Sequence, residues 1–311
     1  MTPEGRGGGA VLWWFALNHI KGAGAATMLR LARVFGSPEA AVHASPDELV
    51  ARGELSPEQA KQVVALAASL DEFEGRLGEY ARRDVALLPT DDPCYPRQLL
   101  DLRSPPPLLY VRGTLLPEDR RAIAVVGTRT PTREGARLAA HLARSLAARG
   151  FTLVSGLARG IDTAAHRGAL AAEQGRTIAV LGSGLLRIYP PENLRLAAKI
   201  AARGALLAEV PPETEVNRRW LLARDRLQAA LSRAVIVVQA HRECGSLVTA
   251  RDAVQCGRLL LGVPWDQPPF ADGWQALHAL GARPLTPETD LDALAAELDL
   301  PRPSPAQPPL L

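Results

Sequence analysis

Three glycine-containing loops hold the residues of this chain whose types and spacing suit the binding of an anion. Each loop comes directly after a short and almost wholly apolar segment. Glycine allows main-chain N–H groups to approach an anion closely, and the forked guanidinium group of arginine matches the geometry of phosphate. The sequence therefore predicts a phosphate-binding surface. The loops are Gly127-Thr128-Arg129, Gly156-Leu157-Ala158-Arg159-Gly160 and Gly182-Ser183-Gly184.

The apolar segments before these loops are predicted to be neighbouring β-strands. Strands this uniformly apolar are buried on both faces, as in a parallel sheet. The loops that follow parallel strands gather at the carboxyl edge of the sheet, where ligands approach the backbone. We therefore expect the three loops to meet at that edge.

Strands and helices alternate over the second half of the chain. Thr130 is expected to cap the first of these helices and Asp162 the second. Six strands with helical crossovers of ordinary length predict an α/β fold with a doubly wound, mostly parallel sheet. The strands are expected at 122–126, 153–155, 177–181, 205–208, 234–239 and 258–263, and the helices at 131–149, 162–174, 192–202, 217–231, 247–256 and 290–298.

The first 80 residues have the pattern of short helices. Ser45 and Ser56 each precede a proline and are followed three residues on by an acid or amide, which predicts a capping box at a helix start. The turn around Gly22 and Gly24 is similar to a helix-hairpin-helix, a module that presents backbone N–H groups to DNA phosphate. A tight turn in an ordinary small helical domain is the alternative, and the net charge of −4 over residues 1–119 favours it.

Changes in composition predict five regions along the chain. The proline-rich connector is expected to pack on the domain that follows it and to hold an edge strand at 108–111, because proline at this density excludes a central strand. The predicted regions are a disordered N-terminus at 1–10, a helical domain at 11–85, the connector at 86–118, the α/β domain at 119–285, and a short helix with a disordered tail at 286–311.

Positive charge is concentrated in the segment that carries the glycine loops. The chain has a formal net charge of +3, divided into −4 for residues 1–119, +12 for residues 120–260 and −5 for the remainder. This concentration favours a polyanionic partner. A solvated surface rich in arginine for compositional reasons is the alternative, since the chain has 33 arginines and 3 lysines. That alternative would not explain why the flanking regions are acidic.

Several classes of protein are disfavoured by what the chain contains. Its three cysteines have no CxxC spacing, which predicts neither a disulfide framework nor a zinc site and suits a reducing cytoplasm. The apolar run 10–17 is too short to span a bilayer. No G-x-G-x-x-G motif follows residue 126, which argues against NAD or FAD. We expect no metal and no cofactor, and we expect no catalytic set from Ser155, Asp162 and His166, because helical spacing directs the histidine away from the serine.

A series of motifs resembles the DNA-processing protein A family, DprA, also called Smf. The resemblance covers roughly residues 12–285. It implies a SAM-like helical domain followed by an extended Rossmann-like domain. The motifs are Tyr95-Pro96, Leu109-Tyr110-Val111-Arg112-Gly113, Val125-Val126-Gly127-Thr128-Arg129, 155–162, Ala165-His166, Ile188-Tyr189-Pro190-Pro191-Glu192-Asn193 and Gly245-Ser246-Leu247-Val248-Thr249-Ala250.

The same resemblance implies a function without catalysis. Family members bind single-stranded DNA, form homodimers, overcome the single-strand-binding protein SSB and load the RecA recombinase, in natural transformation and recombination. Many of them end in a winged-helix-like domain, and this chain stops near the linker to it. The residues expected to bind DNA are Gly127, Thr128, Arg129, Gly156, Arg159, Gly160, Arg195 and Lys199, with Arg224 and Arg226 in a second group that also includes Arg218 and Arg219.

The sequence departs from the family pattern at the edge of this expected site. The segment Trp220-Leu221-Leu222-Ala223-Arg224-Asp225-Arg226 stands where Phe-Pro and then Arg-Asn-Arg are expected. A different class of function, a nucleotide-hydrolysing enzyme similar to the LOG-type phosphoribohydrolases, is the alternative suggested by the loop Gly245-Ser246-Leu247-Val248-Thr249. The glutamate that such enzymes need is missing, since Ala250, Arg251 and Asp252 follow. An interaction scaffold whose arginines only aid solubility is the third alternative.

Overall fold

The computed structural model describes residues 8–300 and divides the chain into two compact units. The first unit comprises residues 1–95 and 103–110, and the second comprises 96–102 and 111–311. Residues 1–7 and 301–311, for which disorder was expected, lie outside the described residues. Residues 8–10 were also expected to be disordered but begin a helix, α1.

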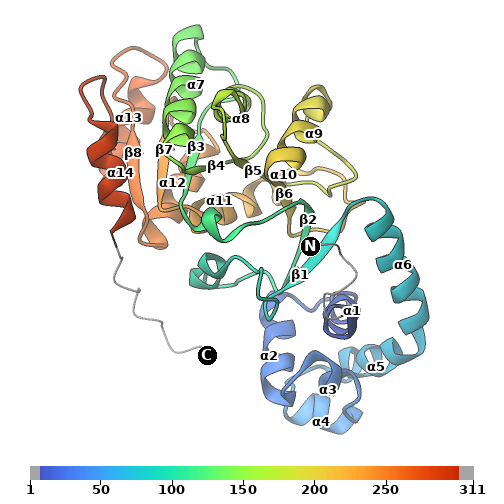
Figure 1. The fold of residues 1–311 in the computed structure, drawn as a ribbon. Helices are drawn as coiled ribbons and strands as arrows, with labels where there is room; N and C mark the ends of the chain where they lie inside the picture. Colours follow the sequence, from blue (N-terminus) through green and yellow to red (C-terminus); the bar gives the residue numbers. More distant parts are fainter. Residues whose placement is uncertain (1–7, 301–311) are drawn as a thin grey trace. The chain divides into compact units, whose positions relative to one another are not determined.

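The first unit is an assembly of short helices with one complete strand (Figure 1). Ser45 and Ser56 form the two expected capping boxes, with Glu48 and Gln59 as the reciprocal partners. Because each serine accepts a hydrogen bond from a backbone N–H of the first turn, it defines where its helix begins. The elements are α1 (Gly8–Leu17), α2 (Ala25–Phe35), α3 (Pro38–Val42), α4 (Pro46–Ala51), α5 (Pro57–Leu66), η2 (Ala67–Ser69), α6 (Leu70–Arg82) and β1 (Ala86–Pro89).

Aromatic packing holds this unit together. The ring of Phe15 on α1 is fully buried and meets Phe73 and Tyr80 of α6 edge to face, at centroid distances of 5.7 and 6.0 Å. Tyr110 packs edge to face on Tyr80, and the hydroxyl of Tyr95 donates to the carbonyl of Pro106 at 2.7 Å. Buried aromatic rings contribute large apolar contacts, so this packing stabilises the helical unit.

The second unit contains a parallel sheet in the order β6-β5-β4-β3-β7-β8-β9, and β1 and β2 precede β6 in the full strand order. This arrangement confirms the predicted doubly wound α/β fold. The expected edge strand is β2, which lies between β1 and β6 and is therefore not at the edge. The strands are β2 (Leu108–Gly113), β3 (Ala122–Val126), β4 (Thr152–Ser155), β5 (Thr177–Leu181), β6 (Ala205–Ala208), β7 (Ala234–Val237), β8 (Leu259–Gly262) and β9 (Arg283–Pro284).

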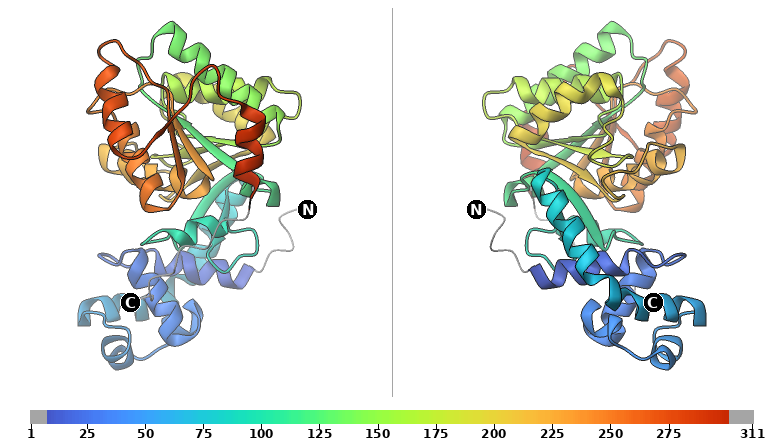
Figure 2. Two further views of the ribbon diagram at one scale, coloured as in Figure 1. Left: turned by 90° about the vertical axis from the view of Figure 1, so that its left-hand side faces the viewer. Right: turned by 90° about the vertical axis from the view of Figure 1, so that its right-hand side faces the viewer.

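Helices cover both faces of this sheet (Figures 1 and 2). Ile123, Val125 and Ile236 share one buried cluster with the apolar residues of α7, α8 and α14. Residues between them in the strands point the other way, because side chains alternate along a strand. The helices are α7 (Arg133–Ala148), α8 (Ile161–Ala171), α9 (Leu194–Arg203), α10 (Arg218–Ala223), α11 (Asp225–Leu231), α12 (Ser246–Gln255), α13 (Ala271–Ala279) and α14 (Leu291–Asp299), with 3-10 turns η3 (Arg97–Asp101), η4 (Pro117–Arg120) and η5 (Pro191–Asn193).

The structure corrects several details of the expected elements. The cap of α7 is Thr132, whose hydroxyl accepts from the N–H of Gly135 at 3.0 Å, so the expectation that Thr130 caps this helix was wrong. The single helix expected at 217–231 is two helices that meet at Arg224. The sequence patterns did not predict α13, β1 or β9. Two strand residues, as in β9, are too few to show periodicity.

The order in which strands are added to the sheet reverses between β3 and β7. From β3 the strands proceed through β4 and β5 to β6, whereas from β7 they proceed the opposite way to β9. The loops after β3 and β7 therefore diverge and leave a crevice at the carboxyl edge. In sheets of this kind, ligands bind at that crevice.

Candidate nucleic-acid interface

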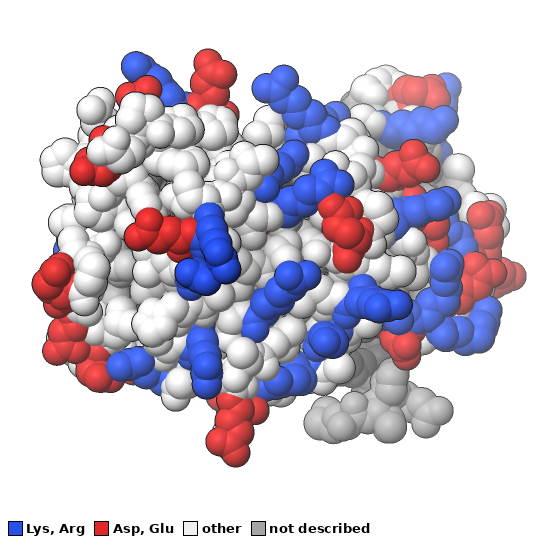
Figure 3. Space-filling model, turned by 90° about the horizontal axis from the view of Figure 1, so that it is seen from above, with Lys and Arg blue, Asp and Glu red and all other residues white. Residues whose placement is uncertain are grey.

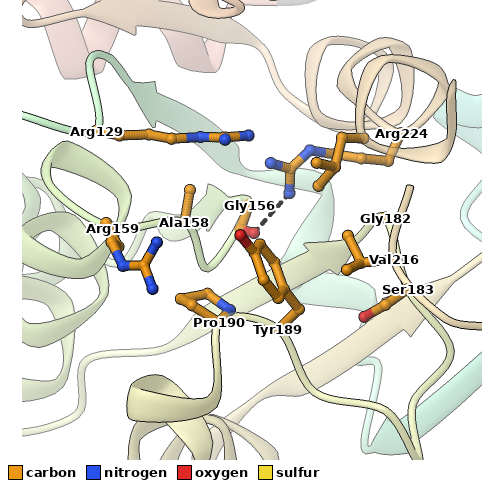
Figure 4. A pocket seen from close by; sticks show the side chains of 11 residues that line it. Arg129, Gly156, Ala158, Arg159, Gly182, Ser183, Tyr189, Pro190, Val216 and Arg224 are labelled. Atoms are coloured by element: carbon orange, nitrogen blue, oxygen red, sulfur yellow. Dashed lines mark hydrogen bonds between the residues drawn. The ribbon is translucent and has the colours of Figure 1, made fainter. Parts of the chain in front are cut away.

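A groove at the carboxyl edge of the sheet brings together the loops after β3, β4 and β7. It has a volume of about 760 Å³ and its wall extends to the start of α10 and to α12. A smaller pocket, which we call the central pocket, shares Arg129, Ala158 and Tyr189 with the groove and adds the loop after β5. Figure 4 shows the side chains of Arg129, Arg159 and Arg224 arranged around Ala158 and Tyr189. Two of the glycine loops thus carry arginines to one place.

Gly160 allows the loop after β4 to pack against the loop after β3. Its φ of +75° lies in a region that residues with a side chain rarely adopt, and an added Cβ would collide with the backbone of Thr128 and Arg129. The N–H of Ile161 donates to the carbonyl of Thr128 at 3.2 Å, and the N–H of Thr128 donates to Gln239 at 2.7 Å. Gly160 and Thr128 therefore set the distance between the loops rather than offering side chains to a ligand.

Asp162 supports the loop that precedes it. We expected this carboxylate to cap the first turn of α8, but the N-cap position is Gly160. Asp162 Oδ2 instead accepts hydrogen bonds from the N–H groups of Gly156 and Ala158, at 3.0 and 3.3 Å. Burial raises the pKa of Asp162, and the positive charge of Arg224 opposes that shift. The carboxylate thus holds the loop in the shape that presents Arg159.

Arg224 is buried beneath the central pocket. Its Nη1 donates to the carbonyls of Gly156 and Val180, each at 2.6 Å, and its Nε donates to Asp225 at 2.7 Å. Only 6% of the residue is exposed. Gly156 has no side chain because an added Cβ would occupy the position of this guanidinium group. We therefore interpret Arg224, which was expected in the second group of DNA contacts, as a residue that joins the loop after β4 to β5 and α11.

Arg129 and Arg159 differ in how they are held. Arg129 is exposed and makes no hydrogen bond or ion pair with any residue from 8 to 300. Arg159, with 53% of its side chain exposed, forms an ion pair with Glu192 of η5. This pair raises the pKa of Arg159 and lowers that of Glu192, so both groups stay charged at neutral pH. A phosphate can reach Arg129 directly but must compete with Glu192 for Arg159.

This difference leads to a prediction for Glu192→Gln. Neutralising Glu192 removes both the competitor for Arg159 and a negative charge beside the central pocket, so the single-stranded DNA that the family resemblance leads us to expect should bind about two- to five-fold more tightly at low salt, with less gain at high salt. Fluorescence anisotropy with a labelled oligo-dT measures the change. Glu173→Gln, an exposed change on the α8–β5 connection, is the control. A gain that persists in the Arg159→Ala background would contradict the competition.

Three of the predicted residues, Arg195, Lys199 and Arg226, lie outside the central pocket and the groove. Arg195 and Lys199 are exposed on α9. Arg226 is half-buried, and its Nη2 donates to both carboxylate oxygens of Glu209 at 2.6 Å. Burial raises the pKa of Glu209, and Arg226 opposes that shift. Arg226 is therefore committed to a structural ion pair.

Sequence reasoning missed two arginines of the groove, Arg242 and Arg251, although both follow β7. They line the groove with Arg218, and all three are exposed. Their position after an apolar strand was the signal that could have identified them. On the face drawn in Figure 3, basic side chains are spread over the middle, and acidic ones gather mainly toward the left and right edges. Such a distribution attracts a polyanion.

The buried Ser155 and His166 take structural roles. The hydroxyl of Ser155 donates to the carbonyl of Val125 at 2.7 Å. The hydroxyl of Thr177 donates to Leu153, so it must accept its second bond from the Nδ1–H of His166, 2.8 Å away. Burial lowers the pKa of His166 to about 3, which keeps the ring neutral. Neither residue is placed to act as a nucleophile or base.

The described residues hold no grouping of three or more histidine, cysteine, aspartate or glutamate side chains arranged for a metal ion. Between residues 8 and 300, no helix combines the length and apolar character needed to cross a membrane. At the loop compared with phosphoribohydrolases, the residue after Thr249 is Ala250, which is fully buried and has no acid–base group.

Comparison with known proteins gives consistent similarities. A family model described as DNA recombination-mediator protein A matches residues 86–296. The chain is 39% identical over 259 residues to Protein Smf of Synechocystis sp., covering 81% of this chain and 64% of that protein. It is 36% identical over 237 residues to DNA processing protein DprA of Bacillus subtilis, covering 74% and 79%. The chain thus spans less than two thirds of the Synechocystis relative.

Two solved structures resemble this one. DNA processing protein A from Streptococcus pneumoniae superposes with a TM-score of 0.77 at 30% sequence identity, covering 90% of this chain and 95% of that chain. DNA processing protein A from Helicobacter pylori superposes with a TM-score of 0.61 at 30% identity, covering 69% and 95%, and it is described as having a unique single-stranded DNA binding mode.

Proposed function

The chain belongs to the DNA recombination-mediator protein A family, DprA/Smf, and from this premise we propose that its groove binds single-stranded DNA. The observation that carries the proposal is Arg129, an exposed and unpaired arginine among the described residues, set where two glycine loops meet. Arg218, Arg242 and Arg251 continue the positive charge along the groove. Exposed guanidinium groups at a crevice suit the phosphates of a flexible strand.

The affinity of the groove for single-stranded DNA should depend strongly on salt concentration. Each phosphate neutralised by an arginine releases counterions, which contributes a slope of about −0.7 to log K against log salt for a single strand. Anisotropy titrations of a labelled oligo-dT at several salt concentrations test this. The same affinity at low and high salt would contradict the proposal that the groove binds DNA phosphates, and it would favour the scaffold alternative.

Arg195 and Lys199 provide an internal comparison. Both are exposed on α9 but lie outside the lining of the groove, so Arg195→Ala or Lys199→Ala should weaken oligo-dT binding by less than about five-fold, in keeping with exposed charge contacts. The same titration compares each variant with Arg129→Ala. A loss from either α9 variant as large as that from Arg129→Ala would show that the strand follows α9 instead.

We further propose that the protein, as a homodimer, loads the RecA recombinase onto strands coated with SSB, in natural transformation and recombination. Family membership supports this part of the proposal. The test is the lag before RecA begins ATP hydrolysis on SSB-coated DNA, which added protein should shorten. Arg129→Ala should lose this effect in proportion to its lost DNA binding. Light scattering tests the dimer, and a monomer at micromolar concentration would contradict it.

A further inference from the structure

Two residues in the lining of the groove are joined by a hydrogen bond, and each has a carbonyl or carboxylate oxygen left over as an acceptor. Asp225 and Gln228 belong to α11, and we call them the acceptor pair. Gln228 Nε2 donates to Asp225 Oδ1 at 2.9 Å, and Arg224 Nε donates to the same oxygen at 2.7 Å. This contact determines the orientation of the Gln228 amide, because the opposite orientation would bring two acceptors together.

The acceptor pair has capacity that the described protein does not use. Gln228 is 1% exposed, and its Oε1 is buried without a hydrogen-bond partner. Both bonds to Asp225 arrive at Oδ1, so no described residue donates to Oδ2. Buried polar atoms normally have partners, so the unpaired Oε1 of Gln228 points to a ligand or a solvent molecule. Gln228 Oε1 can accept one N–H donor of a ligand, and Asp225 Oδ2, on the residue hydrogen-bonded to Gln228, can accept a second.

The opposite end of that partner should be negative. Arg129, Arg218, Arg242 and Arg251 are exposed along the groove, whereas the acceptor pair is buried. A nucleotide has this combination, because its base carries N–H donors and its phosphate is an anion. The groove volume of about 760 Å³ lies within the range of sites that enclose small molecules.

The base edges differ in how well they match two acceptors. Guanine presents the neighbouring donors N1–H and N2–H2 on its Watson–Crick edge. Thymine presents one N–H between two carbonyl oxygens, and those oxygens would face the acceptors. Because unpaired or opposed polar groups are costly when buried, the match should discriminate between the bases.

We propose that the acceptor pair, Asp225 and Gln228, recognises the Watson–Crick edge of a guanine whose phosphate is held by the arginines of the groove. The inference rests on the proposed function, because it gives base selectivity to the groove that binds the strand. A guanine within a strand and a free guanine nucleotide share this chemistry, and separate arms of the experiment distinguish them.

The first arm compares labelled 20-mers of oligo-dT, alternating dT-dG and alternating dT-dI, using the full chain at pH 7.5 and one salt concentration. We expect dT-dG to bind about five-fold or more tightly than oligo-dT, as for a good paired contact to a base. The dT-dI strand should be intermediate, because hypoxanthine keeps N1–H and lacks the amino group. The second arm displaces labelled oligo-dT with dGMP or dTMP.

Two variants test whether the preference for guanine depends on the acceptor pair. Asp225→Asn replaces one acceptor by a donor, and Gln228→Met removes the other without a large change in volume, so both should bring the dT-dG to dT affinity ratio toward one. The control is Asp252→Asn, the same chemical change on α12 outside the groove lining, which should keep the wild-type ratio. Thermal unfolding establishes that each variant is folded.

Each outcome of the experiment is informative. Equal, salt-dependent binding of dT-dG and oligo-dT by the wild type, with no selective competition by dGMP, would overturn the inference and leave the proposed function standing. Competition by dGMP alone would support recognition of a free nucleotide. A preference that survives in both variants would place base recognition elsewhere. Failure of every strand to bind would instead overturn the proposed function.

Discussion

Replacing Arg129 with alanine is expected to weaken single-stranded DNA binding about ten-fold or more. The guanidinium group is exposed in both the central pocket and the groove, and no described residue competes for it. A charge-assisted hydrogen bond contributes about 1.5–3 kcal/mol, which corresponds to that loss. Arg159→Ala should weaken DNA binding less, because Arg159 must break its ion pair with Glu192 before it can bind a phosphate.

Anisotropy with labelled oligo-dT at several salt concentrations measures the loss. The slope of log K against log salt should become shallower by about 0.7 for one lost phosphate contact. Arg129→Lys should retain the slope and recover part of the affinity, since lysine keeps the charge but not the forked donors. Arg137→Ala, an exposed change on α7 outside the groove, is the control. Wild-type affinity in Arg129→Ala would refute the proposed site.

Replacing Arg224 with methionine is expected to destabilise the second unit by about 3–5 kcal/mol, as when one partner of a buried ion pair is removed. The carbonyls of Gly156 and Val180 would lose their donor, and Asp225 would lose its neighbouring positive charge. For a protein of this size, the melting temperature should fall by on the order of 10 °C. Arg219→Met, an exposed change on α10, should alter it little.

The pH dependence of this loss provides a second measurement. Burial already raises the pKa of Asp225 to about 6, and removing Arg224 should raise it further. In the folded variant, Asp225 therefore binds a proton at pH values at which the same carboxyl group in the unfolded chain is ionised, so lowering the pH stabilises the folded variant. The difference in the free energy of unfolding between variant and wild type should narrow as the pH falls from 8 to 5.5. Thermal unfolding across this range tests the sign. A wider difference at pH 5.5, or a change of under 2 °C at pH 8, would contradict the role given to Arg224.

The two arginines show why residue type and spacing predict a site better than they predict its contacts. Arg129 belongs to a motif that resembles the family, Arg224 belongs to the segment where the sequence departs from the family pattern, and both were expected to bind DNA. Burial separates their roles, because Arg224 lies below the loops and its guanidinium group donates to the carbonyls of Gly156 and Val180. Burial depends on which segments pack together, so local sequence could not reveal it.

What the sequence determined by itself was the alternation of apolar strands and capped helices, and hence a parallel sheet whose glycine loops share one edge. Periodicity, capping residues and glycine positions act over a few residues, so they can be read locally. Only the tertiary structure decided that Glu192 forms an ion pair with Arg159, that Arg242 and Arg251 line the groove, and that Gln228 Oε1 has no hydrogen-bond partner among the described residues. These relations join residues far apart in the chain, and they depend on how the strands are ordered and packed.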